Sequence, residues 1–423
     1  MRYTKKKLKN GLRVITAPMK GTETATVLVM VGVGSRYESE TEAGLSHFIE
    51  HMMFKGTKKR PDTLNIAEEL DSIGGEYNAF TSKNRTGYWA KVDATHLDTA
   101  LDVVADIFLN SKLESKEIER EKGAILQELA MYEDMPMRSI EDTFENLLYG
   151  NQKLGREIIG YKKTVSAFKR KNFVDYMNKF YVANDTVVCV AGKIDEKEVI
   201  QKIEKYFSKF DGKEKPEFEK VKEDQKSPKI KIKEKKTDQT HLALGVRAYD
   251  DNHKDRYVLS VLSTILGGNM SSRMFISIRE RQGLAYYVRT GAERYEDAGY
   301  LVTNSGVEHK NLSKTIESIL SEYKKIASKK IENKELQKAK DYLKGTMVMG
   351  LESSDEVASF LTNQEVRKGE ILTPEEIFER IDQVSIQDVL RVAKDIFKKE
   401  NLNLAVIGPH ENSKKFKAIL DNF

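Results

Sequence analysis

The chain has 423 residues, which is too long for one ordinary domain and suits two. Lysine and arginine number 71 against 66 aspartates and glutamates, and the small net charge of +5 is interleaved along the sequence. This balance argues against a dedicated nucleic-acid-binding protein, whose basic residues should form a patch or stripe. No apolar run approaches the length of a membrane span, so we expect no membrane partner.

The first half opens with short predicted strands at residues 11–15 and 25–31. Residues 1–9 are basic, but no apolar signal region follows them, so we expect a cytoplasmic protein without a secretion signal. The single cysteine, Cys189, lies in the apolar segment 187–191, which reads as a buried strand. One cysteine cannot form a disulfide within the chain, which fits a reducing compartment.

The most informative segment reads His-Phe-Ile-Glu-His at residues 47–51. On a helix, His47 and His51 lie one turn apart on the same face, with Glu50 beside them. Two imidazoles and one further carboxylate make a three-ligand zinc site with an open fourth position, where a nearby Glu can manage the proton of a bound water. The order H-x-x-E-H is that of the inverzincins. The alternative is a surface helix with scattered His and Glu. It is disfavoured by an apolar opposite side formed by Leu45, Phe48, Ile49 and Met52.

A third ligand is expected from residues 111–133, which show helical spacing of apolar side chains. Glu121 and Glu128 are two turns apart on this predicted helix, and both lie beside its apolar stripe. Carboxylates that point inward are costly unless they are paired or bind a metal. One of the two acids would then bind zinc while the other supports the site. The alternative is a pair of rim acids that reach solvent.

Residues 208–236 are dense in Lys and Glu and contain Pro216 and Pro228, which indicates an exposed linker or hairpin between two domains. The halves echo each other, because each opens with strands and closes with a short apolar strand and a helix. The closing strands are predicted at 187–191 and 404–407, and the helices at 197–210 and 413–420. We therefore expect two α+β repeats, each a mixed sheet with packed helices. The predicted domains are 1–210 and 231–423, with a linker at 211–230.

Three segments carry a resemblance to the pitrilysin/insulinase family of inverzincin zinc metallopeptidases. They are residues 44–57, residues 74–81 and residues 119–128. The chain looks most like the mitochondrial processing peptidase β-subunit and its single-chain bacterial relatives. The resemblance implies that His47, His51 and Glu128 bind one zinc ion, that Glu50 is the general base, and that Glu121 is an accessory acid. The segment matching Asn78, Ala79 and Phe80 binds substrate in the family.

The second half also resembles the family, at residues 266–275 and 279–286. The resemblance implies that Arg279 and Tyr286 reach the substrate near the zinc, where a guanidinium and a hydroxyl are suitable donors to an oxyanion. Without the family context, an exposed helix-end Arg and a strand Tyr would be the ordinary interpretation. The implied fold is a processing-peptidase-like clam shell, with a zinc-binding catalytic domain and a substrate-clamping domain.

The sequence thus predicts a zinc-dependent endopeptidase that acts on peptides or unfolded segments. The likeness to the processing peptidases favours a homodimer. The alternative function is a non-catalytic, peptide-binding partner subunit of an active relative. Such subunits in the family typically lose the zinc residues or the Arg/Tyr pair, and this chain has both sets.

Overall fold

The computed structural model describes all 423 residues, which form two compact units. The first unit comprises residues 1–130, 156–219 and 347–374. The second comprises residues 131–155, 220–346 and 375–423. Each unit contains one mixed β-sheet with helices packed on it.

The sheet of the first unit has six strands, whose order across the sheet is β1-β2-β6-β3-β5-β4. β2 and β6 run parallel, and every other neighbouring pair is antiparallel. β6 is buried along its whole length, including Cys189, which confirms the predicted buried strand. The bounds are β1 (Thr4–Lys7), β2 (Arg13–Pro18), β3 (Thr24–Val31), β4 (Glu76–Thr81), β5 (Thr86–Asp93) and β6 (Thr186–Gly192).

The sheet of the second unit has five strands in the order β7-β11-β8-β10-β9. Its only parallel pair is β7 with β11. Across the sheet, these five strands correspond one by one to β2-β6-β3-β5-β4 of the first unit. The predicted fold class, α+β with two homologous mixed-sheet domains, is therefore confirmed. The bounds are β7 (Lys229–Glu234), β8 (Thr240–Ala248), β9 (Ala285–Arg294), β10 (Gly299–Val307) and β11 (Leu402–Gly408).

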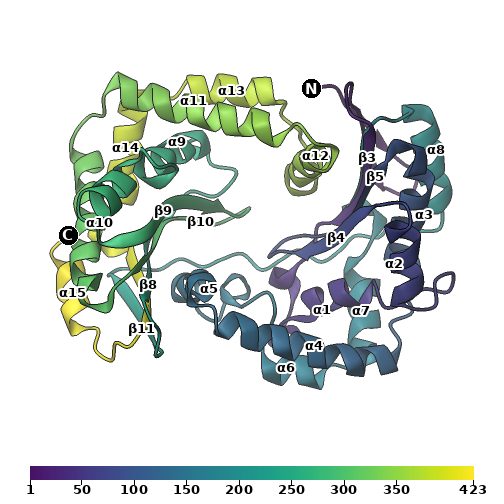
Figure 1. Cartoon of the computed structure of the whole chain (residues 1–423), viewed down its shortest axis with the longest axis horizontal. Helices are drawn as coiled ribbons and strands as arrows, with labels where there is room; N and C mark the ends of the chain where they lie inside the picture. Colours follow the sequence, from purple (N-terminus) through teal and green to yellow (C-terminus); the bar gives the residue numbers. More distant parts are fainter. The chain divides into compact units, whose positions relative to one another are not determined.

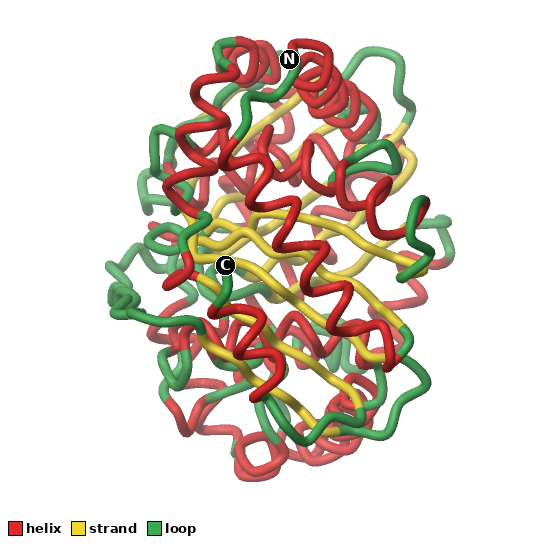
Figure 2. The backbone as a smooth tube through the Cα atoms, turned by 90° about the vertical axis from the view of Figure 1, so that its left-hand side faces the viewer, coloured by secondary structure: helices red, strands yellow, loops and turns green.

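Helices cover both faces of each sheet. In Figure 1, α12 lies on one side of the first sheet, and α3 and α8 lie on the other. In Figure 2, red helices close to the C-terminus lie over yellow strands. The helices of the first half are α1 (Leu45–Met52), α2 (Thr63–Asp71), α3 (Leu97–Asn110), α4 (Ser115–Glu133), α5 (Pro136–Tyr149), α6 (Lys162–Ala167), α7 (Arg170–Phe180) and α8 (Glu196–Tyr206). Those of the second half are α9 (Arg256–Gly267), α10 (Leu312–Ser328), α11 (Asn333–Gly350), α12 (Ser354–Lys368), α13 (Pro374–Asp382), α14 (Ile386–Ile396) and α15 (Lys414–Asp421).

Helix α5 comes from the first half of the sequence but belongs to the second unit. It starts with Pro136, whose fixed φ suits the first helical turn. Its apolar side chains recur every four residues and pack against buried residues of β8, β10 and β11. Those side chains are Ile140, Phe144 and Leu148.

Helix α12 makes the reciprocal exchange, because it comes from the second half and belongs to the first unit. Val357, Ala358 and Leu361 pack against Leu28 and Cys189 in the core of the first sheet. The helix ends at Lys368 and is followed by Gly369, whose φ of +67° is the left-handed conformation that favours glycine at this position. The compact units therefore differ from the continuous ranges 1–210 and 231–423 by two exchanged segments, 131–155 and 347–374. Residues 211–228 contain no helix or strand, and β7 begins at the end of the predicted linker.

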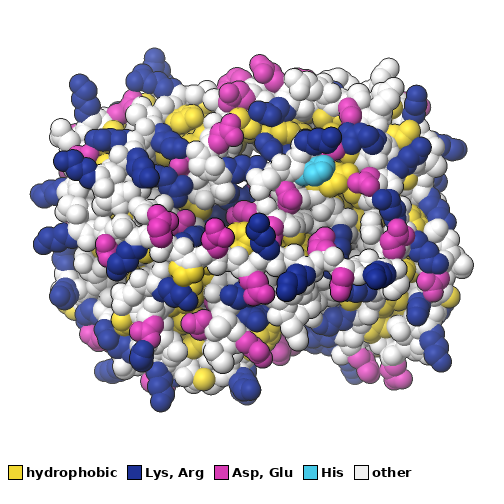
Figure 3. Space-filling view, turned by 180° about the vertical axis from the view of Figure 1, so that it is seen from behind, with side chains coloured by type: hydrophobic (Ala, Val, Ile, Leu, Met, Phe, Trp, Pro, Cys, Tyr) yellow, Lys and Arg dark blue, Asp and Glu magenta, His cyan; other side chains and the backbone are white.

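The surface mixes charges of both signs. Figure 3 shows Lys and Arg side chains interspersed with Asp and Glu across the face that it presents. None of the helices is both long enough and apolar enough to cross a membrane.

Candidate metal centre

Helix α1 carries the two histidines of the predicted site. It begins after Gly44, whose φ is +95° and where a Cβ would lie 2.6 Å from the carbonyl oxygen of Ile159, so this position requires glycine. The side of α1 away from the histidines packs into the core, as predicted, and this packing directs His47 and His51 toward α4. The core-facing residues are Leu45, Phe48, Ile49 and Met52, each with an exposed fraction of 0%.

The buried carboxylate of Glu38 holds the start of α1. It accepts hydrogen bonds from the backbone N–H groups of Gly44 (2.8 Å) and Ser46 (2.7 Å), which no helical carbonyl can satisfy. Ser46 in turn shares a 2.9 Å hydrogen bond with the hydroxyl of Tyr176 on α7. Burial raises the pKa of Glu38 to about 8, although its hydrogen bonds act in the opposite direction.

This raised pKa predicts a pH-dependent stability. A carboxyl whose pKa is higher in the folded than in the unfolded state stabilises the fold while protonated, and that stabilisation is lost as pH rises toward 8. Replacing Glu38 with Gln removes the titration. Between about pH 5 and about pH 8, the unfolding free energy of the wild type should fall by up to about 4 kcal/mol more than that of Glu38→Gln. Urea unfolding of both proteins in excess zinc measures this difference, and parallel pH profiles would contradict it.

Helix α4 supplies both predicted carboxylates. The Oε2 atom of Glu128 lies 3.7 Å from Nε2 of His47 and 3.5 Å from Nε2 of His51. The Oε1 atom of Glu121 lies 2.9 Å from Nδ1 of His51, on the other edge of the same ring. The structure therefore brings all four residues together and places the two acids at different edges of the His51 ring. Glu128 faces the converging histidine nitrogens, and Glu121 holds the back of His51.

The donor atoms of His47, His51 and Glu128 fit a zinc ion. They all lie within 4.8 Å of one another. In a tetrahedral site with bonds of about 2.0–2.1 Å, neighbouring ligand atoms are about 3.3 Å apart, which is close to the two measured separations. Two imidazoles and a carboxylate are also a ligand set found in catalytic zinc sites. In such sites the protein supplies three ligands, and water or substrate occupies the fourth position.

Burial and hydrogen bonding set the charge state of the ligands and their supports. Burial lowers the pKa of His51, but the hydrogen bond to Glu121 and the nearby carboxylates outweigh it and raise the pKa overall. Burial acts to raise the pKa of Glu121, but its contacts with His51 and Lys55 leave that pKa below its usual value. A proton on His51 and a metal ion therefore compete for one site, so metal binding is expected to weaken in acid.

Glu50 lies on the same face of α1 and is held from the neighbouring sheet. The Thr81 hydroxyl donates a 2.6 Å hydrogen bond to Oε2 of Glu50. Burial raises the pKa of Glu50, while the Thr81 bond and nearby His51 act to lower it. A raised carboxyl pKa brings the group closer to that of an efficient general base at neutral pH. Thr81 was not predicted as a site residue, because its contact depends on how β4 lies beside α1.

Strand β4, which contains Asn78, Ala79 and Phe80, lies at the edge of the first sheet. It pairs only with β5, so its other side presents backbone groups that can hydrogen-bond an added strand. Thr81 at the end of this strand is the residue that contacts Glu50. The structure thus places the three predicted substrate-binding residues on an edge strand that contacts the helix carrying the two candidate histidine ligands.

Arg279 and Tyr286 belong to the second unit and contact each other. Arg279 lies in a π-helical turn at Phe275–Glu280, and Tyr286 is the second residue of β9. The guanidinium carbon of Arg279 is 4.7 Å from the ring centre of Phe275 and 5.1 Å from that of Tyr286. Tyr286 is 76% exposed, which is unusual for a large aromatic side chain and leaves it able to meet a substrate. Their role in catalysis stays a prediction.

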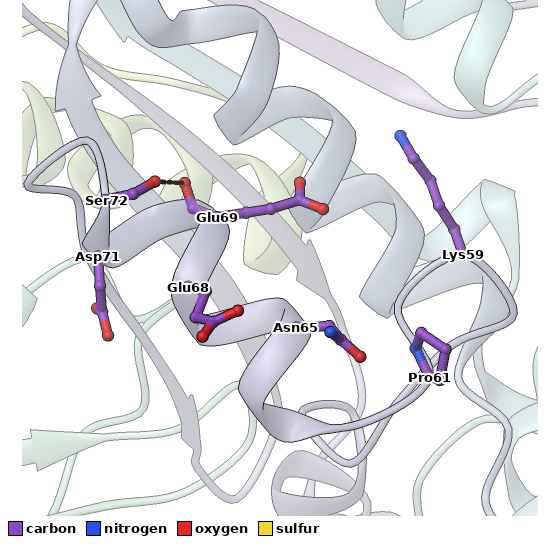
Figure 4. A pocket seen from close by; sticks show the side chains of 7 residues that line it. All are labelled: Lys59, Pro61, Asn65, Glu68, Glu69, Asp71 and Ser72. Atoms are coloured by element: carbon purple, nitrogen blue, oxygen red, sulfur yellow. Dashed lines mark hydrogen bonds between the residues drawn. The ribbon is translucent and has the colours of Figure 1, made fainter.

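A polar pocket beside α2 includes none of these residues (Figure 4). Its wall on α2 contains Glu69, which is already paired with the buried Arg60 at 2.5 Å. We assign no function to this pocket. Its lining residues are Lys59, Pro61, Asn65, Glu68, Glu69, Asp71 and Ser72.

Comparison with known proteins gives consistent matches along the chain. The family described as "Insulinase (Peptidase family M16)" matches residues 13–162, and "Peptidase M16 inactive domain" matches residues 167–343. A Bacillus subtilis protein named "Uncharacterized zinc protease YmxG" is 37% identical over 97% of this chain and 98% of its own length. An uncharacterized zinc protease of Mycobacterium leprae is 34% identical over 96% and 92%, respectively.

Solved structures show the same fold. A protease from Helicobacter pylori has a TM-score of 0.90 at 23% identity, covering 96% of this chain and 99% of that one. A Pseudomonas fluorescens structure titled as a peptidase M16 inactive domain has a TM-score of 0.89 at 16% identity, covering 97% and 99%. The matches cover both repeats, and the zinc-ligand pattern falls within the first family match. On these grounds the chain belongs to the insulinase family of peptidases, family M16.

Proposed function

We propose that this protein is a zinc-dependent endopeptidase that hydrolyses peptides or unfolded segments. The observation that carries the proposal is the convergence of His47 Nε2, His51 Nε2 and Glu128 Oε2 at separations suited to one zinc ion. Both relatives described above are named as uncharacterized zinc proteases, and these names support the same chemistry. One zinc ion per chain follows from one such donor set.

The residues around the donor set have distinct tasks in this proposal. Zinc held there would polarise the scissile carbonyl and lower the pKa of a water molecule. Glu50 takes the proton of the attacking water and passes it to the leaving amine. Thr81 holds one carboxylate oxygen of Glu50, so that the carboxylate keeps one orientation during the transfer. Glu121 fixes the ring of His51 through Nδ1.

The edge strand β4 is the proposed substrate-binding element. A peptide that adds to this edge would form backbone hydrogen bonds regardless of its sequence, with its side chains alternating between the two faces. This mode suits extended or unfolded segments, since a folded protein has few free strands to offer. Asn78, Ala79 and Phe80 would provide the contacts, directly before the residue that holds Glu50.

Arg279 and Tyr286 are proposed to stabilise the oxyanion or anchor the substrate. A guanidinium and a phenol are donors that can serve a developing negative charge. Because the second unit supplies both residues, hydrolysis would depend on both units even though all three zinc ligands lie in the first. We further propose that the protein works as a homodimer in the cytoplasm. Its only cysteine is fully buried, so neither a disulfide nor an oxidising compartment is needed.

The experiment that tests the proposal measures zinc and hydrolysis together. We expect the purified wild type to bind one zinc ion per chain and to cleave members of a peptide library, with products identified by mass spectrometry. A chelator should stop cleavage, and added zinc should restore it. A zinc-loaded protein that binds the peptides and leaves them intact would contradict the proposal and support the alternative, a non-catalytic peptide-binding subunit.

A further inference from the structure

A lysine within residues 44–57, to which the family resemblance assigned no role, contacts the support of the candidate metal centre. Lys55 Nζ lies 2.7 Å from Oε2 of Glu121. The other oxygen of the same carboxylate, Oε1, lies 2.9 Å from Nδ1 of His51. Both oxygens of Glu121 are therefore engaged, one by the lysine and one by the ring whose Nε2 faces Glu128. The Lys55 and Glu121 side chains are only 24% and 9% exposed, so water competes weakly for this pair.

The turn that carries Lys55 is tied to both helices of the site. The Lys55 backbone N–H donates to the carbonyl of Met52, the last residue of α1, at 3.2 Å. The neighbouring carbonyl of Gly56 accepts from the Lys112 N–H at 3.0 Å. The Ser111 hydroxyl also donates to the Met52 carbonyl at 3.1 Å, just before α4 begins. Lys55 is thus held between the end of one ligand-bearing helix and the approach to the other.

We propose that Lys55 is a positioning residue for the metal centre, acting through Glu121 on His51. By fixing one oxygen of Glu121, it turns the other toward Nδ1 of His51. In the neutral imidazole, the proton is then on Nδ1 and is donated to Glu121. Nε2 is left with its lone pair free to bind the metal. The proposal rests on the metal site of the proposed function and adds a third link to it: lysine, carboxylate, histidine.

The charges around the site support this role. Three carboxylates, those of Glu50, Glu121 and Glu128, lie close to the two histidines. A divalent ion balances two of these charges, and Lys55 is the cation that contacts one of them directly. Without Lys55, the Glu121 carboxylate would be free to rotate away from His51 toward the positive ion. The ring of His51 would then lose the contact that sets its orientation.

The test is a zinc-affinity series measured by competition with a chromophoric chelator. Lys55→Met should weaken zinc binding about tenfold, which is the low end of the effect of losing a residue that supports a metal ligand. Lys55→Arg keeps the positive charge and should retain most of the wild-type zinc affinity. The matched control is Lys122→Met, which removes a lysine one residue from Glu121 that pairs instead with Glu119 at 2.7 Å. The control should bind zinc as the wild type does. Circular dichroism of the metal-free proteins verifies that the variants fold.

A double-variant cycle distinguishes the proposed chain of contacts from a general charge effect. Glu121→Gln should weaken zinc binding by itself, and adding Lys55→Met to it should cause no further loss, because the lysine acts only through that carboxylate. Unchanged or tighter zinc binding in Lys55→Met, failure of Lys55→Arg to rescue, or additive losses would each overturn the proposal. If the wild type itself binds no zinc, the proposed function fails rather than the role of Lys55 alone.

Discussion

Replacing Glu50 with Gln should abolish peptide hydrolysis while zinc binding remains. Gln is close in size to Glu and can still accept the Thr81 hydrogen bond, but it cannot take a proton from water. Of the three carboxylates at the site, Glu121 and Glu128 are assigned as support and ligand, so neither replaces Glu50 as the base. We expect kcat to fall by at least about a thousandfold, within the range for losing a general base. Product formation by mass spectrometry and zinc content by atomic absorption measure the two effects.

A suitable control for Glu50→Gln is Glu119→Gln, the same change at an exposed position of α4. It should leave both hydrolysis and zinc content at the wild-type level. Hydrolysis by Glu50→Gln within about tenfold of the wild type would show that another group moves the proton, because general acid–base catalysis contributes more than that. Loss of zinc in Glu50→Gln would instead show that Glu50 is needed to build the metal site.

Replacing Glu128 with Gln should remove zinc as well as activity. The amide has no negative charge and is a poorer zinc donor, so one of three ligands is effectively lost. We expect zinc affinity to fall by more than about a hundredfold, beyond the effect of changing an outer-shell partner. Chelator competition measures the affinity. Glu128→Gln and Glu50→Gln are therefore both inactive but opposite in zinc content, and equal zinc content in the two would contradict the assignment of ligand and base.

The geometry of the candidate metal site could be predicted largely because its pattern is local. His47 and His51 are four residues apart, and Glu121 and Glu128 are seven apart, so helical geometry alone places each pair on one face. The same geometry could not decide which glutamate faces the metal, since both share a face of α4. The family resemblance chose Glu128, and the structure places its Oε2 near both Nε2 atoms.

The supporting residues could not be predicted, because their contacts cross between elements. Glu38 reaches the start of α1 from an upstream turn, and Lys55 reaches Glu121 from the turn that follows α1. Nothing in the spacing of these residues marks them. In a chain with 32% charged residues, an acid a few residues before a helix and a lysine soon after it do not stand out.

The continuous domain ranges could not show the exchange of α5 and α12 for a related reason. Each helix has an ordinary apolar stripe that can pack on any sheet of suitable shape. Which sheet it covers depends on contacts between residues far apart in the chain, such as Cys189 with Leu361. Local periodicity predicts that the helix exists and leaves its partner undetermined.

The exchange also sets an order for folding on the ribosome. All strands of the first sheet have been synthesised once β6 is complete, but the helix that covers one of its faces, α12, is made only after most of the second half. The nascent chain must therefore carry an uncovered apolar surface, including Leu28 and Val187, through much of its own synthesis. Completion of the first unit therefore waits until α12 has been synthesised, at a point when β11, which lies between β7 and β8 in the second sheet, is still to be made.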